Sequence, residues 1–434
     1  MSKSEEHQVV IIGAGPAGMF LAYLLVTNGI SVRVIERHPD FKREFRGEGI
    51  QPSVMKALDR LGFLPYLIEQ GIAVPAHRAK IFLGDREVLT LGGEEGDLED
   101  FGLVVFQEGF LEFMHEQCSR FPHYRLDMGT TVTGIQREDG RVAGVQVRTR
   151  GGREETIGGN FFVTAAGRST GLRKQAGIEV DVLESSFDIY WMKFDAPDDP
   201  ALIPDGFRAY LQDESMFIFY RTYDERIQVA WGKRGWKGPG FRDIEGLKRR
   251  LTDEVPAGYR PMVEEQFSDK TERQLLKVAC DRMQTWHIPG MLFIGDAAHT
   301  MSPVAGQGIN LAIRDSIVAA NHLIRAKTRG EPWDTALCRA VEKERRPEVE
   351  AMQDFQVRLG HLMLGASRRQ RSLFFRYMMP LLSALGIRRR FVRNVQHGVT
   401  DVEIDYPVTL AELDARVQLS RVPADSLLNI QLSG

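Results

Sequence analysis

Residues 8–28 read QVVIIGAGPAGMFLAYLLVTN, and this stretch sets the fold of the chain. Gln8–Ile12 is an apolar run typical of a buried strand, and Pro16–Asn28 predicts a helix. Gly29 follows where a helix end favours a left-handed residue, and Ser31–Ile35 predicts a second strand. Residues 9–26 carry no charge, but four of them are glycine or proline. We therefore expect strand, turn and helix here rather than a membrane span.

The glycines of this turn indicate a dinucleotide site. Gly13 permits a tight turn, Gly15 lets the backbone approach a pyrophosphate, and Gly18 lets helix and strand pack closely. Pro16 and Ala17 begin the helix, whose N-terminus attracts phosphate charge. Glu36 ends the next strand 23 residues after Gly13, the usual place of an acid that accepts from the ribose of an adenosine. The motif predicts a dinucleotide without saying which one.

The rest of the chain predicts two interleaved blocks and a helical end. Hairpins are expected around residues 84–86 and around Asp139-Gly140, and aromatic strand-like segments follow between residues 187 and 231. We expect an α/β fold in which an FAD-binding Rossmann-like domain is interleaved with a β-rich substrate domain, followed by a helical C-terminal region. The predicted FAD-binding domain comprises 6–75, 102–180 and 283–330, the substrate domain 76–101 and 181–282, and the helical region 331–434.

Composition narrows the class of protein. The chain has 434 residues, of which 43% are hydrophobic and 26% charged, as in ordinary globular proteins. The net charge of −3 gives no general reason to expect nucleic-acid binding. Three cysteines lie far apart, which excludes a disulfide framework and a cysteine zinc cluster and fits a reducing cytoplasm. We expect a cytoplasmic protein without a metal site.

A second turn favours a flavin over a nicotinamide. Asp296, in the sequence GDAAH, follows a predicted buried strand, where its carboxylate can accept hydrogen bonds from a sugar-alcohol chain. Pro303 and the residues Gly306-Gln307-Gly308-Ile309-Asn310 lead into a long predicted helix. Such a turn leaves backbone N–H groups free to stabilise negative charge on a reduced isoalloxazine ring. His299 is expected to have a structural role.

Taken together, these motifs resemble one family. The sequences GAGPAG (13–18), Glu36-Arg37, RGEGIQPSVMKALDRLG (46–62) and GDAAHTMSPVAGQGINLAIRD (295–315) are similar to those of FAD-dependent aromatic hydroxylases of the p-hydroxybenzoate hydroxylase type. The resemblance extends from about residue 8 to residue 326. It implies that Arg46 lies near the flavin, that Gln107 contacts the FAD ribose region and that Asp296 holds the ribitol. It also implies that Pro303 and 306–310 cup the ring, and that Arg37 and Gly167 are cofactor-binding residues.

One motif departs from the family pattern. The family usually has Asp-Gly in a DGxxS motif, whereas this chain has Ala166-Gly167 with Thr170 in place of the serine. Gly167 and Arg173 still match. In the family that aspartate is associated with nicotinamide use, so Ala166 puts efficient reduction by NADH or NADPH in doubt more than FAD binding. No second glycine turn of the first kind occurs, and we expect no separate nicotinamide domain.

The resemblance implies an NAD(P)H-dependent and FAD-dependent monooxygenase. It would hydroxylate an aromatic or polyketide-like molecule with O2 through a flavin C4a-hydroperoxide, in a site that excludes water. No catalytic base can be assigned from the sequence; the candidates in the strand-rich block are Tyr190, Tyr210, Tyr220, Arg208 and His77.

The C-terminal region has an unusual composition. Residues 368–393 contain eight arginines and no acid, and an apolar stretch within them is too short to span a bilayer. One interpretation is peripheral contact with anionic lipid. The other is a helical hairpin that caps the site, with its arginines solvated or paired with Asp401, Glu403 and Asp405.

Three further functions stay open at this point. A geranylgeranyl-type isoprenoid reductase would saturate double bonds without oxygen. A flavin-dependent halogenase shares the FAD motifs, but here only Trp286-His287-Ile288-Pro289 resembles its WxWxIP segment. A flavin-binding protein without catalysis is suggested by Ala166 alone.

Overall fold

The computed structural model describes residues 7–42, 49–92, 102–168, 171–183, 187–234 and 243–406. Its largest sheet in these ranges has eight strands, in the order β19-β20-β11-β1-β2-β8, with β10 and β9 extending from β11. The strands β20, β11, β1, β2 and β8 run parallel, as expected of a dinucleotide-binding sheet. The bounds are β1 His7–Ile12, β2 Val32–Ile35, β8 Tyr124–Asp127, β9 Thr130–Glu138, β10 Arg141–Thr149, β11 Glu154–Thr164, β19 His287–Ile288 and β20 Met291–Phe293.

Three helices pack together over this sheet. Helix α1 (Pro16–Val26) contacts both α4 (Gln107–Ser119) and α8 (Gly308–Arg329). Ten of the eleven residues of α1 are buried, which explains why its sequence is apolar on every side. Gly29 has φ +66°, so it takes the left-handed conformation predicted after this helix. The charge-free stretch 9–26 is therefore strand, turn and helix, as predicted.

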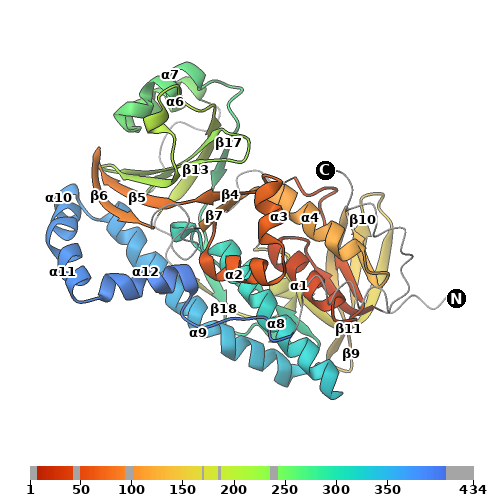
Figure 1. The fold of residues 1–434 in the computed structure, drawn as a ribbon. Coiled ribbons are helices and arrows are strands. Elements are labelled where there is room, and N and C mark those ends of the chain that lie inside the picture. The colour runs from red at the N-terminus through yellow and green to blue at the C-terminus, as the bar shows by residue number, and fades with distance from the viewer. Residues whose placement is uncertain are drawn as a thin grey trace.

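A second sheet lies apart from the first (Figure 1). Its order is β17-β13-β16-β15-β14-β5-β6, and α6 (Ile244–Glu254) and α7 (Arg260–Gln266) cover one of its faces. Successive side chains of each strand point to opposite faces of the sheet. Phe217 and Phe219 pack with these helices, whereas Met216 and Ile218 face the opposite side. The bounds are β5 Arg78–Leu83, β6 Arg86–Leu91, β13 Asp188–Phe194, β14 Gly206–Leu211, β15 Ser215–Arg221, β16 Ile227–Lys233 and β17 Arg273–Leu276.

Short elements join these layers. Two three-stranded sheets are formed by β3 Gly49–Ile50, β7 Gly102–Val105 and β4 Ala73–Ala76, and by β12 Val180–Leu183, β18 Cys280–Met283 and β21 His299–Thr300. The remaining α-helices are α2 Pro52–Arg60, α3 Leu64–Glu69, α5 Leu172–Ala176, α9 Thr335–Gly360, α10 Arg368–Leu373, α11 Met379–Ala384 and α12 Ile387–His397. Two π-helical segments, His361–Gly365 and Phe374–Met378, interrupt the C-terminal helices. None of the helices in the described ranges is both long and apolar enough to cross a bilayer.

Most predicted elements are present, with shifted ends. The turn at Asp139-Gly140 has φ +49° and +78°, the pair of positive values that a two-residue hairpin needs. Strand β11 begins at Glu154, and its first half pairs with β10. Strand β8 was not predicted, since Tyr124–Asp127 is half polar.

Candidate active site

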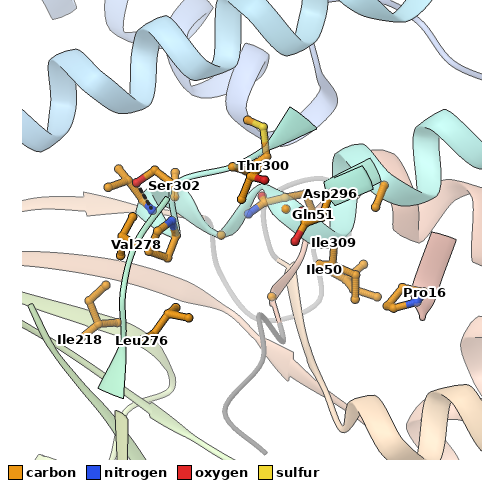
Figure 2. A pocket seen from close by; sticks show the side chains of 18 of the residues that line it. Pro16, Ile50, Gln51, Ile218, Leu276, Val278, Asp296, Thr300, Ser302 and Ile309 are labelled. Carbon is orange, nitrogen blue, oxygen red and sulfur yellow. Dashed lines mark hydrogen bonds between the residues drawn. The ribbon is translucent and has the colours of Figure 1, made fainter. Parts of the chain in front are cut away.

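One large cavity connects the two sheets. Its volume is about 1110 Å³, and its wall includes residues of the first glycine turn, the Asp296 turn, the second sheet and the C-terminal helices. Figure 2 shows Pro16 at one end of the view and Ile218 and Leu276 at the other, with Asp296, Gln51 and Ile309 between them. Segments far apart in the sequence therefore form a single continuous site.

The first glycine turn is built as its sequence indicates. Gly13 has φ +104°, and a Cβ there would lie 2.6 Å from the carbonyl oxygen of Ala165 on the neighbouring strand. A Cβ on Gly18 would overlap the carbonyl oxygen of Gly13. A Cβ on Gly15 would meet no protein atom within 4 Å, and Gly15 lines the cavity together with Pro16 and Ala17. The backbone at Gly15 is thus open to whatever occupies the cavity.

Glu36 connects this turn to the end of β2. Its carboxylate accepts from Ala14 N at 2.8 Å and from His38 N at 2.9 Å, and the side chain is buried in the cavity wall. A carboxylate oxygen can accept more than one hydrogen bond, so this geometry suits a ribose hydroxyl as a further donor. Arg37 lines the cavity next to it.

The Asp296 turn is held in place by charged groups from other segments. Buried Arg173 donates to the carbonyls of Ala297 at 2.8 Å and Asp296 at 2.6 Å, and it pairs with Asp281 at 2.9 Å. Asp315 on α8 accepts from Gly295 N at 2.9 Å. Asp296 itself lines the cavity. The position of this carboxylate therefore depends on Arg173 and Asp315.

Asp315 belongs to a buried charge network that the sequence analysis missed. It accepts from His299 Nε2 at 2.7 Å and Arg345 Nε at 2.8 Å, and both of its partners are fully buried. Burial raises the pKa of the Asp315 carboxyl, but the neighbouring His299 and Arg345 outweigh burial and lower it overall. Arg345 also pairs with Glu348, which binds Arg314 at 2.8 Å. In the sequence, this network is indicated by the polar residues that interrupt the apolar pattern of α8. His299 has the structural role expected.

The second glycine turn, residues 303–310, forms part of the cavity wall. Pro303, Gly306, Gly308 and Ile309 line the cavity. Asn310 is not among the lining residues: its amide donates to the carbonyls of Gly49 and Gly306, each at 2.9 Å, and accepts from Gln51 N at 2.7 Å. Asn310 thus joins the turn to β3, and its predicted contact with the cofactor stays a prediction.

The remaining predicted residues lie around the same cavity. Gln107, the first residue of α4, and Gly167 are in the wall. Ala166 also lines it, and the Arg168 guanidinium donates to the Lys277 carbonyl at 2.9 Å. Arg46 lies outside the described residues.

The cavity fits an anionic dinucleotide. Helices α1, α4 and α8 all begin at its wall, and none has a side-chain cap on its first N–H groups. Uncapped helix N-termini stabilise negative charge, as pyrophosphate and reduced flavin require. The open backbone at Gly15 and the carboxylates of Glu36 and Asp296 complete a set of groups suited to FAD.

The second sheet supplies an apolar wall with a few polar groups. Its lining side chains include Trp191, Phe207, Met216, Ile218 and Tyr220. The Tyr220 hydroxyl accepts from Gln228 Nε2 at 2.5 Å, and Trp191 Nε1 is buried without a hydrogen-bond partner among the described residues. His77 lines the cavity as well.

Three candidate catalytic residues do not reach the cavity. Tyr190 and Tyr210 pack on the opposite face of the sheet with α6 and α7, where burial raises the pKa of both phenols. Arg208 donates to the carbonyls of Ala201 at 2.7 Å and Ile203 at 3.0 Å. A phenol with a raised pKa is less often deprotonated near neutral pH, and so is less available as a base. Tyr220 and His77 are the candidates that line the cavity.

The fold and the cavity define a flavin-dependent oxidoreductase, and comparisons with known proteins agree. Residues 6–356 match the family described as FAD binding domain. The chain is 30% identical over 397 residues to 6-methylpretetramide 4-monooxygenase of Streptomyces rimosus, covering 90% of this chain and 92% of that one. It is 26% identical to squalene epoxidase 3 of Arabidopsis thaliana over 317 residues, 71% of this chain and 58% of that one.

A solved structure has the same fold. The p-nitrophenol 4-monooxygenase PnpA from Pseudomonas putida DLL-E4 superposes with a TM-score of 0.77 at 18% identity, over 91% of this chain and 99% of that one. The chain belongs to the FAD-dependent aromatic hydroxylases, the flavoprotein monooxygenases that bind FAD and take electrons from NADH or NADPH. This relationship favours a monooxygenase over the isoprenoid reductase and the halogenase.

Proposed function

We propose that this enzyme hydroxylates an aromatic or polyketide-like small molecule with O2. The observation that carries the proposal is the continuity of the cavity: it runs from the Gly13–Gly18 turn, past Asp296, to the apolar face of the second sheet. A ring bound on that face would lie next to the second glycine turn. The related 6-methylpretetramide 4-monooxygenase and p-nitrophenol 4-monooxygenase are named for aromatic substrates of this kind.

We propose the following roles for the cavity residues. The turn at Gly13, Gly15, Pro16, Ala17 and Gly18 would hold the FAD pyrophosphate, with Glu36 and Arg37 at the adenosine. Gln107 would contact the ribose region of FAD, and Gly167 would also contact the cofactor. Asp296 would hold the ribitol, and Pro303 with 306–310 would support the ring. In domain terms, segments 6–75, 102–180 and 283–330 would bind FAD, and 76–101 and 181–282 would bind the substrate; β5 and β6 lie in one sheet with β13–β17, in keeping with this division.

When bound, FAD supplies the electron transfer and the activation of O2. The protein would exclude water and orient the substrate ring. Among the described residues of the cavity wall, basic side chains outnumber acidic ones: the acids are Glu36 and Asp296, and the bases are Arg37, Arg78, Lys80, Arg168 and Arg358. Arg78 and Lys80 also pair with Asp205 and Glu87, respectively. An excess of positive charge stabilises a deprotonated phenol, which is the more reactive form toward an electrophilic oxygen. Tyr220 lines the cavity on the face of the second sheet, and its phenol would contact such an oxygen on the substrate.

A substrate screen tests this function. Phenols, naphthols and polycyclic aromatic ketones would be incubated with the holoenzyme and NADH or NADPH, with nicotinamide loss and product mass recorded. Hydroxylation predicts substrate-stimulated nicotinamide oxidation and a product heavier by one oxygen atom. A product heavier by two hydrogens would instead indicate a reductase. If neither nicotinamide reduces the flavin anaerobically with any aromatic present, the protein is a flavin binder without this catalysis or needs a separate reductase.

Two matched variants test the substrate face. Tyr220→Phe removes a hydroxyl in the cavity wall, whereas Tyr210→Phe removes one from the opposite face of the same sheet. We expect Tyr220→Phe to raise KM or shift the pH profile of kcat, and Tyr210→Phe to leave both unchanged. Equal effects of the two variants would argue against binding of the substrate on this face.

A further inference from the structure

The C-terminal helices α10 to α12 expose an unusual amount of apolar surface. Six large hydrophobic side chains between residues 373 and 387 are 45% to 63% exposed, whereas few such residues are exposed in the rest of the described chain. They are Leu373, Tyr377, Met378, Leu381, Leu385 and Ile387. A patch of this kind on a folded protein commonly marks a surface that another molecule covers.

The same helices are strongly basic. No aspartate or glutamate occurs between residues 355 and 400. Arg371 is buried, where it donates to the Met363 carbonyl at 2.8 Å and the Asp213 carbonyl at 3.1 Å. In contrast, Arg369, Arg376 and Arg393 are exposed and form no ion pair with any described residue. Two of the three acids that the sequence analysis considered as partners pair elsewhere: Glu403 with Arg60 and Asp405 with Arg325.

Basic and apolar side chains share one face. Arg369, Leu373, Arg376 and Tyr377 line a single shallow groove on the outside of this region. Arg369 and Leu373 lie four residues apart in α10, and Arg376 and Tyr377 follow in the adjoining π-helical segment. Two guanidinium groups therefore flank an apolar strip, the pattern of a helix that lies at a lipid–water interface.

The inner side of these helices belongs to the active site. Phe375, Met379, Leu382 and Val392 line the large cavity. Figure 1 shows α10, α11 and α12 along one flank of the molecule, and among the described residues several of their apolar side chains are exposed. One thin helical layer thus separates the cavity from whatever binds this outer surface.

We propose that the outer surface of α10 to α12, formed by Arg369, Arg376, Arg393 and the exposed apolar residues other than Ile387, which lines the cavity, binds an anionic lipid bilayer. Charge complementarity selects this occupant: phosphate headgroups match guanidinium groups that form no ion pair with any described residue, and acyl chains match the apolar strip. A symmetric contact with a second copy would place arginines against arginines. Helices of 6 and 11 residues are too short to cross a bilayer, so binding would be interfacial.

Vesicle sedimentation tests the proposal with the FAD-loaded full chain. The probes are vesicles of phosphatidylcholine alone and vesicles with about one third phosphatidylglycerol, at low and high salt. We expect binding to the anionic vesicles that weakens with salt, and little binding to the neutral ones. Absence of binding to anionic vesicles at low salt overturns the proposal.

Matched variants assign the binding to this surface. The triple variant Arg369→Gln, Arg376→Gln, Arg393→Gln should weaken binding about 100-fold, since each basic residue near an anionic surface strengthens it roughly fivefold. Leu381→Glu with Leu385→Glu should abolish binding. Controls on other surfaces, Tyr66→Glu and Arg148→Gln with Arg150→Gln, should stay within about twofold of the wild type. The flavin spectrum of each variant verifies its fold.

Two further results would contradict the proposal. If the control variants lose vesicle binding as strongly as the variants in α10 to α12, the attraction is not located on these helices. If sedimentation shows a dimer that Leu381→Glu with Leu385→Glu converts to a monomer, and vesicles do not bind, the surface is an interface between two copies of this chain instead.

Discussion

Replacing Gly15 by alanine tests the cofactor site while disturbing the protein little. Gly15 precedes α1 with φ −77° and ψ −177°, a conformation that alanine adopts without strain. An added Cβ meets no protein atom within 4 Å and would project into the cavity. We therefore expect the apoprotein to lose about 1 kcal/mol of unfolding free energy or less, the usual effect of alanine at a helix start.

The effect on FAD should be much larger. A Cβ at Gly15 would hold the pyrophosphate away from the N–H groups at the start of α1 and weaken at least one charge-assisted hydrogen bond. Such a bond contributes roughly 1.5–3 kcal/mol, so the Kd for FAD should rise about 10- to 100-fold. Titration of apoprotein with FAD, followed by the quenching of flavin fluorescence, measures this change.

A control separates this effect from the general effect of adding a methyl group. Gly151 lies in the loop after β10 and is not among the residues that line the cavity, and a Cβ there has its nearest contact at 4.0 Å, with Thr149 Oγ1. Gly151→Ala should leave the Kd for FAD unchanged. If Gly15→Ala also leaves it within twofold of the wild type, the pyrophosphate does not approach this turn and the assignment of the site is wrong.

Three more changes test the surrounding framework. Gly18→Ala should destabilise even the apoprotein by about 1–3 kcal/mol, seen as a lower thermal midpoint, because its Cβ overlaps the Gly13 carbonyl. Asp315→Asn should lower stability by about 3–5 kcal/mol and release FAD more readily, because it leaves buried Arg345 with one partner fewer; an unchanged urea midpoint would refute this. Glu342 has its pKa lowered to about 2, because contacts with His287, the Trp286 N–H and Arg346 outweigh its burial. The ionised carboxylate therefore adds about 1–2 kcal/mol to the free energy of unfolding after solvent screening. This contribution is complete above pH 4.5 and is lost as the pH falls toward 2. The wild type and Glu342→Gln should therefore differ in stability at pH 7 and converge in acid.

Local signals account for the parts of the fold that the sequence predicts. The turn at 13–18, the helix end at Gly29 and the hairpin at Asp139-Gly140 each need specific residues at specific backbone angles, so a few letters are enough. The pairing of β14 with β5 is different. It joins Gly206 to Arg78, more than a hundred residues apart, and nothing local in either strand specifies the partner.

The same distinction applies to the site. Glu36 and Asp296 were predictable because each follows a strand whose end is set by the fold. Tyr220 could not be separated from Tyr210 by sequence, since the side of the sheet that each faces depends on register. Likewise, the hydrogen bonds of Asn310 to Gly49 and Gln51 arise from tertiary packing alone.

A crystal structure of the FAD-loaded protein tests the central claim most directly. We expect the pyrophosphate at Gly13–Gly18, a ribose hydroxyl bonded to Glu36, and the ring between residues 303–309 and the apolar sheet face. Flavin bound elsewhere, or a ring remote from that sheet, would contradict it.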